Sequence, residues 1–112
     1  MIDLSEEDHK LIALAKQARA RIQALEGAAV RDDTGRSYSG ATVELPSATF
    51  SALQLAVAQA VAAGARDIEA AVVVTNSANT DVQSVMDASI TPTPVHICSP
   101  RGDVTASTIV ES

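Results

Sequence analysis

The sequence predicts an α/β protein in which helices pack as two or three layers around one mixed β-sheet. Two helix-like segments, one amphipathic and one rich in alanine, are separated and followed by short β-branched runs. Helices that alternate with hydrophobic strands are typical of such layered folds. A chain of 112 residues has room for one hydrophobic core, so we expect a single domain over residues 1–112.

The first helix is predicted over residues 5–26. Ser5 and the acidic residues 6–8 have the pattern of a capping box, in which the serine accepts a hydrogen bond from the backbone three residues later. Apolar residues then recur at spacings of three and four, namely Leu11, Ala15, Ala18, Ile22 and Leu25. Gly27 follows as the expected end of the helix.

A hairpin and a second helix are predicted next. Two short strand-like runs, residues 28–32 and 37–43, flank an Asp- and Gly-containing turn. Pro46 interrupts the chain, and we expect Ser47 to cap a helix that ends at Gly64. Alanine lies on nearly every face of this helix, which predicts that the helix is buried.

The remaining elements are a strand over residues 68–75, a short helix, and two final strands. Asn79 is the expected cap of the short helix, which runs through Val82 and Met86. The last strands are expected over residues 95–98 and 104–110. The predicted order is therefore helix, strand, strand, helix, strand, helix, strand, strand.

Composition and charge exclude several classes of protein. The formal net charge is −6, and Tyr38 and Phe50 are the two aromatic residues, so we expect no nucleic-acid binding. With 21 alanines the core is thin, which favours a homo-oligomer. A single cysteine, Cys98, allows no internal disulfide, and the acidic start does not read as a signal peptide. No apolar run is long enough for a membrane span, so we expect a cytoplasmic protein without a membrane partner.

Several short segments, in this order, resemble the cytidine deaminase family from about residue 5 to residue 110. They read GAAV at 27–30, DTGR at 33–36, GATVE at 40–44, AVVV at 71–74 and TPV at 93–95. The resemblance implies a cytidine deaminase-like α/β/α sandwich, with a mixed five-stranded sheet and about three helices. It also implies assembly as a dimer or tetramer, which the alanine-covered helix from Ser47 to Ala63 would permit.

Members of this family hold zinc through three His or Cys ligands, and a glutamate that is not a ligand transfers protons. The family's T-x-C-A-E motif falls on residues 49–53, which puts Ser51 at a ligand position and Leu53 at the glutamate. Its P-C-x-x-C motif puts Asn79 and Val82 at the two cysteines. These four residues suit neither zinc binding nor proton transfer, so we expect no cofactor. The resemblance implies a catalytically inactive member that acts as an oligomeric binding or scaffold protein.

Two alternatives stay open. The family's N-V-E-N motif falls on residues 42–45, where Glu44 matches the ribose-binding glutamate and Thr42 replaces an asparagine, so the protein could be a nucleoside sensor without chemistry. It could instead be a nucleoside deaminase or other hydrolase with relocated catalytic residues, such as His96, Cys98 or Asp81. His96 and Cys98 are two apart on a predicted strand and share one face, so they could also begin a metal site with Asp81 or Asp87 as a third ligand.

Overall fold

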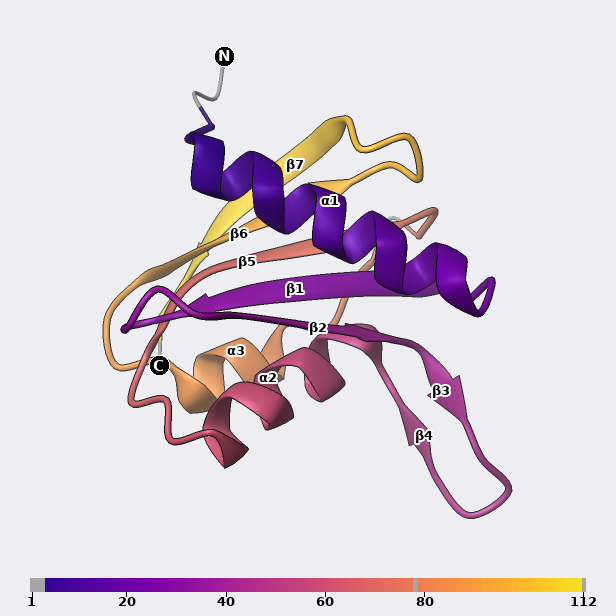
Figure 1. Cartoon of the computed structure of the whole chain (residues 1–112), viewed down its shortest axis with the longest axis horizontal. Helices are drawn as coiled ribbons and strands as arrows, with labels where there is room; N and C mark the ends of the chain where they lie inside the picture. Colours follow the sequence, from indigo (N-terminus) through magenta and orange to yellow (C-terminus); the bar gives the residue numbers. More distant parts are fainter. Residues whose placement is uncertain (1–3, 78, 112) are drawn as a thin grey trace.

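The computed structural model of the protein describes residues 4–77 and 79–111 and contains a mixed five-stranded sheet with three helices, as predicted (Figure 1). The strand order is β2-β1-β5-β6-β7; β5 and β6 are parallel, and the other neighbours are antiparallel. A second sheet consists of β3 and β4 alone. The elements are α1 (Glu6–Arg21), β1 (Glu26–Asp32), β2 (Ser37–Ala41), β3 (Val43–Glu44), β4 (Thr49–Phe50), α2 (Ala52–Ala62), β5 (Ile68–Thr75), α3 (Gln83–Ala88), β6 (Thr93–Cys98) and β7 (Val104–Val110).

The sheet is covered on both faces, which makes the fold a three-layer α/β/α sandwich (Figure 1). On one face, Leu11 and Ala15 of α1 pack in a cluster with Val72 and Val74 of β5. On the other face, residues of α2 and α3 pack against alternate residues of the same strands, in a cluster that includes Leu53. The run of valines in β5 is therefore buried on both faces, as expected for a central strand.

The first helix starts where predicted and ends earlier than predicted. Ser5 Oγ accepts a hydrogen bond from the Asp8 backbone at 3.1 Å, and Asp8 Oδ2 accepts one from the Ser5 backbone at 3.3 Å. The helix ends at Arg21 because the chain reverses direction at Gln23, which has a positive φ of 51°. The predicted end at residue 26 is therefore wrong.

The apolar spacing that suggested a longer helix has no packing role after α1 ends. Ile22 and Leu25 are 56% and 69% exposed. Gly27 lies inside β1 and does not terminate the helix. A Cβ on Gly27 would collide with the backbone oxygen of Ala15 and would lie 2.8 Å from the backbone nitrogen of Arg19. This glycine therefore lets β1 pass very close to α1.

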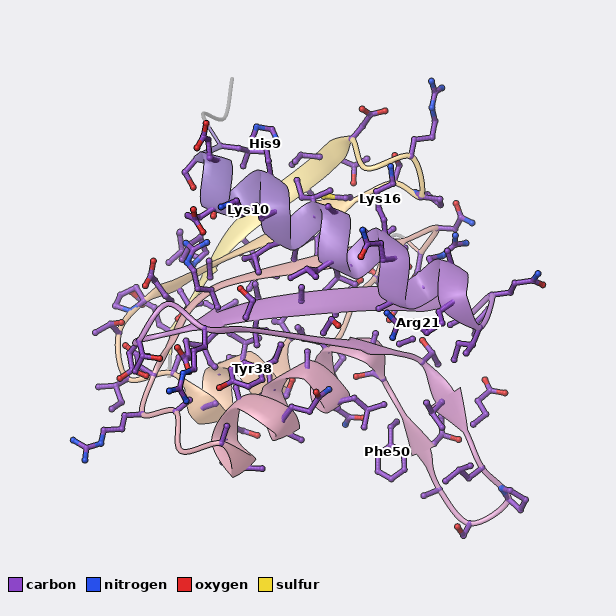
Figure 2. All side chains as sticks on the ribbon, viewed as in Figure 1. His9, Lys10, Lys16, Arg21, Tyr38 and Phe50 are labelled. Carbon is purple, nitrogen blue, oxygen red and sulfur yellow. The ribbon has the colours of Figure 1, made fainter. Side chains whose placement is uncertain are left out.

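The second helix begins four residues later than predicted. Leu45 and Ala48 exchange two backbone hydrogen bonds, so residues 45–48 form the turn of the β3–β4 hairpin, and Ser47 caps no helix. This hairpin projects from the body of the molecule (Figure 1), and Figure 2 shows Phe50 on it. Ser51 is the actual cap of α2. The helix buries one side only, because Val61 on its other side is 53% exposed.

The third helix is preceded by Val82 at the cap position, without a side-chain cap, so the prediction that Asn79 caps it is wrong. The strands predicted over residues 68–75 and 104–110 match β5 and β7, and β6 begins two residues before the predicted 95. Among the described residues, no helix has the length and apolar character needed to cross a membrane.

Two aspartates, Asp32 at the end of β1 and Asp67 just before β5, stabilise turns at the end of the sheet that lies away from the β3–β4 hairpin. Asp32 accepts hydrogen bonds from the backbone and hydroxyl of Thr34, from the Arg36 backbone and from the Tyr38 hydroxyl. Asp67 accepts bonds from the Ile90 backbone and the Thr91 hydroxyl. Desolvation raises the pKa of each carboxyl, but the hydrogen bonds together outweigh it, so both pKa values lie below the ordinary value.

Candidate functional site

An open cavity of about 840 Å³ lies where β5 ends, bordered by the start of α2, the base of the β3–β4 hairpin and the loop that follows β5. Its lining includes Thr42 and Glu44 beside the hairpin, Ser51 at the start of α2, and Asn76 and Asp81 in the loop. Polar side chains from the hairpin, the start of α2 and the loop after β5 therefore lie together around one cavity. This cavity is the candidate site.

Ser51, which the sequence resemblance aligns with the family's first zinc ligand, is engaged in capping α2. Its hydroxyl accepts a hydrogen bond from the Gln54 backbone at 3.0 Å, and Gln54 Oε1 accepts one from the Ser51 backbone at 2.8 Å. The serine therefore satisfies orphan backbone groups at the helix start. Ser51 still lies in the wall of the cavity.

Leu53, which the sequence resemblance aligns with the family's proton-transferring glutamate, belongs to the core. Its side chain is 1% exposed and packs in the cluster between the sheet and α2, with Val73 of β5 among its members. It does not line the cavity at the start of α2. A leucine at this position contributes apolar packing to the fold.

Asn79 and Val82, which the sequence resemblance aligns with the family's two cysteines, line a separate cavity of about 270 Å³ beside β6 and β7. Asn79 is held by Ser77, whose hydroxyl donates to the Asn79 carbonyl at 2.9 Å and accepts from its backbone N–H at 3.1 Å. Val82 packs partly buried against the core. The structure therefore brings Thr42, Glu44 and Ser51 into one cavity, and Leu53, Asn79 and Val82 lie outside that cavity's lining.

The cavity wall is acidic. Glu26, Glu44 and Asp81 contribute three carboxylates, and Arg19 contributes the one base in the described lining. The Arg19 guanidinium is partly engaged, because its Nε donates to the Leu25 carbonyl at 3.3 Å. Such a wall disfavours an anionic ligand and suits a neutral or cationic ligand that can donate hydrogen bonds.

The three residues that the resemblance aligns with the family's zinc ligands do not fit a zinc ion. Val82 has no donor atom, the Ser51 hydroxyl is engaged in its cap, and Asn79 lines a different cavity. Zinc sites in proteins need three or four His, Cys or carboxylate donors that converge on one point. Within residues 4–77 and 79–111, no three His, Cys, Asp or Glu side chains form a group that could hold a metal ion.

His96 and Cys98 lie on the α1 face of the sheet, as the strand spacing predicts. His96 is opposite Val72 in the β5–β6 pair, and Cys98 packs in the same cluster as Val72. His96 Nδ1 lies 2.7 Å from Ser107 Oγ on β7. Burial, with a smaller contribution from Asp103, raises the pKa of the Cys98 thiol to about 11. The thiol is therefore an unreactive core group at neutral pH.

The two aspartates considered as partners of His96 and Cys98 have other contacts. Asp81 accepts a hydrogen bond from the Gln83 backbone at 2.9 Å, and Asp87 accepts one from Gln83 Nε2, also at 2.9 Å. Asp81 belongs to the lining of the cavity at the start of α2. The described residues form no metal-binding group of three that would include these side chains.

Sequence reasoning missed part of the cavity lining. Asn76, Ser77 and Thr75 come at the end of β5, and Gln54 comes from the first turn of α2. A polar run directly after a buried strand that has a parallel neighbour was the available signal, because ligands in α/β folds commonly bind beyond the carboxyl ends of such strands.

Comparisons with known proteins agree with the fold and define its family. The model of the family described as cytidine deaminase-like matches residues 4–102. A cytidine deaminase from Burkholderia pseudomallei has a TM-score of 0.76 at 26% identity, with 95% of this chain and 93% of that chain covered. A cytidine deaminase from Mycobacterium tuberculosis has a TM-score of 0.67 at 23% identity, with 83% and 85% covered, and one from Mycobacterium leprae has 0.66 at 17%, with 96% and 94% covered. None of the curated proteins compared with the chain matches it. The chain belongs to the cytidine deaminase-like family.

Proposed function

We propose that this protein is a catalytically inactive member of the cytidine deaminase-like family that works as an oligomeric binding or scaffold protein. The proposal is supported by the chemistry of four residues, Ser51, Leu53, Asn79 and Val82, which the sequence resemblance aligns with the family's zinc ligands and its glutamate. A leucine and a valine can neither coordinate zinc nor transfer a proton. A positioned proton-transfer group alone contributes roughly 100- to 10,000-fold in rate, so its loss removes most of the deaminase chemistry.

Turnover of cytidine and deoxycytidine tests the proposal. We expect no release of ammonia above the rate in a buffer blank, at an enzyme concentration that would reveal turnover many thousand-fold slower than a typical enzyme. Turnover that scales with protein concentration would contradict the proposal. A His96→Ala variant then separates the enzymatic alternative, because relocated chemistry at His96 would lose activity in this variant.

Nucleoside binding without turnover is a second candidate, and it is supported by the shared cavity. Thr42 and Glu44, which match the family's ribose-binding motif, line the same cavity as Ser51. Glu44 lies at the end of β3 and offers a carboxylate that can accept hydrogen bonds from ribose hydroxyls. The other two carboxylates of the wall disfavour a phosphate, so the proposed ligand is a nucleoside and not a nucleotide.

Calorimetry with cytidine, uridine and cytidine monophosphate tests this second candidate. We expect heat from at least one nucleoside, weaker binding of the monophosphate, and a loss of roughly tenfold in affinity in a Glu44→Gln variant, since a hydrogen bond to a charged acceptor contributes about 1.5 kcal/mol or more. An Asp87→Asn variant is a matched control outside the cavity. If neither cytidine nor uridine gives heat at millimolar concentration, nucleoside binding is dismissed and the scaffold role is left.

Self-association through α2 completes the proposal. The exposed side of this helix carries Ala58, Ala62 and Val61, which is 53% exposed, together with two glutamines and no charged side chain. Small side chains allow two helices to approach closely. Sedimentation at micromolar concentration should give a dimer or tetramer, and a single species of 11.5 kDa would count against the oligomeric part of the proposal.

A further inference from the structure

The last strand, β7, forms one edge of the five-stranded sheet and has no described strand beyond it (Figure 1). Five consecutive residues of this seven-residue strand, 105–109, are exposed. Ile109 among them is 61% exposed. In an edge strand, every second residue directs its backbone N–H and C=O away from the sheet, where they are free to pair with another strand.

The sequence of β7 lacks the charged residues and the proline that commonly protect an edge strand. Residues 104–110 read VTASTIV, without a charged residue and without proline, in a chain in which 20% of the residues are charged. Five of the seven side chains are β-branched, which favours extended pairing. Proteins usually prevent edge pairing with lysine, proline, a covering helix or a bulge. The one irregularity in the β6–β7 register lies at the start of β7, opposite Cys98, and leaves the rest of the strand regular.

The strand at the opposite edge of the sheet, β2, has closer contacts with a helix. Helix α2 packs against β2, and Gln59 Nε2 donates a hydrogen bond to the Ser39 carbonyl of this strand at 2.6 Å. Gly40 of β2 approaches α2 so closely that a Cβ on it would lie 2.8 Å from the Ala52 carbonyl oxygen. One backbone carbonyl of β2 is therefore engaged by α2, whereas residues 105–109 of the longer edge strand, β7, are exposed.

We propose that β7 pairs in antiparallel fashion with β7 of a second copy of this chain, so that two five-stranded sheets join into one continuous sheet. A two-fold axis places the same stretch of both copies opposite each other, which satisfies the free backbone groups of both. Two copies can meet at β7 without bringing like charges together, because each copy has a net charge of −6 and β7 contributes none of it. The interface is separate from α2 and does not depend on whether the protein is catalytically inactive.

The test is the association state of two variants that carry two added lysines each. The first variant, Ala106→Lys with Thr108→Lys, changes two exposed residues of β7 whose side chains form no hydrogen bond with the described residues. In a two-fold antiparallel pair centred on residue 106, 107 or 108, these substitutions bring a lysine of one copy opposite a lysine of the other. Ala58→Lys with Val61→Lys makes the matched change on the exposed side of α2. Sedimentation of both variants and the unchanged protein at 1–100 µM, which spans roughly the range of weak to moderate dimers, gives the result.

We expect the unchanged protein and the α2 variant to share a β7-mediated dimer, and the β7 variant to dissociate at least tenfold more readily. The proposal is overturned if the unchanged protein is monomeric at 100 µM, or if the β7 variant associates as well as the unchanged protein. Loss of association in the α2 variant alone would also overturn it, while supporting self-association through α2. If the β7 variant is unfolded by circular dichroism, hydrogen exchange in the unchanged protein decides: β7 amides must exchange more slowly at high than at low protein concentration.

Discussion

Replacing Leu53 by glutamate restores the residue type of the family at a side chain that is 1% exposed here. Loss of the buried leucine's apolar contacts costs about 2–3 kcal/mol. The introduced carboxyl must also stay neutral in the core. Its unfolded pKa is about 4.3, roughly 2.7 units below pH 7, and each unit costs about 1.36 kcal/mol, so neutralisation costs about 4 kcal/mol. The total of about 6 kcal/mol approaches the whole stability of a typical small domain.

The pH dependence of Leu53→Glu distinguishes a core position from a cavity position. A carboxyl whose pKa is raised by burial weakens the fold least below its unfolded pKa, near pH 4.3, and progressively more as the pH rises. We therefore expect the stability difference between the variant and the unchanged protein to grow by several kcal/mol between pH 4.5 and pH 7.5. A Leu53→Gln variant is the matched control, because it loses the same contacts and its deficit should not vary with pH.

Urea unfolding followed by circular dichroism at the two pH values measures these differences. The account requires Leu53→Glu to be far less stable than Leu53→Gln at pH 7.5 and similar to it at pH 4.5. If the glutamate variant is within about 1 kcal/mol of the unchanged protein at pH 7.5, the side chain at this position reaches water. Leu53 would then belong to the cavity, and the description of its role would be wrong.

Three further outcomes follow from the contacts of the fold. Gly27→Ala should lower the unfolding free energy by about 2 kcal/mol, because the added methyl group meets the rigid backbone of Ala15; thermal unfolding measures this. Ser51→Ala should cost about 1 kcal/mol in the same assay, whereas Ser47→Ala should cost almost nothing, and the reverse order would show that the helix begins at the hairpin. Asp32→Asn should destabilise the protein by roughly 1–3 kcal/mol at pH 7. Because the pKa of Asp32 is lowered in the fold, the stability lost in Asp32→Asn should persist above about pH 4 and shrink as the pH falls through the folded pKa. A loss of stability that is unchanged at about pH 2.5 would refute the role of the Asp32 charge.

The sequence predicted the layers and the sheet because the strongest signals were local. The valine run of β5 and the capping box at Ser5 each lead to one structure, and both are found where expected. The end of α1 was mispredicted because Leu25 continues the helical spacing by coincidence. A left-handed residue at Gln23 reverses the chain, and glutamine gives no sign of this in the sequence.

The candidate site was harder to predict because it is assembled from distant segments. Glu44 and Ser51 were identified through the family pattern, and they share a cavity. The same pattern grouped Asn79 and Val82 with Ser51, but these two residues line another cavity. The loop after β5 borders both cavities, and its path depends on local hydrogen bonds, such as those of Ser77 with residue 79, that the family spacing does not encode.

The zinc content of the chain, purified without chelator and measured by atomic absorption, tests the central claim most directly. Of the three residues that the resemblance aligns with the zinc ligands, Ser51 is engaged in a helix cap, and Asn79 and Val82 line another cavity. We expect far less than one zinc per chain, with no change in thermal stability when a chelator is added. One tightly bound zinc per chain, with a fall in stability on chelation, would contradict the account.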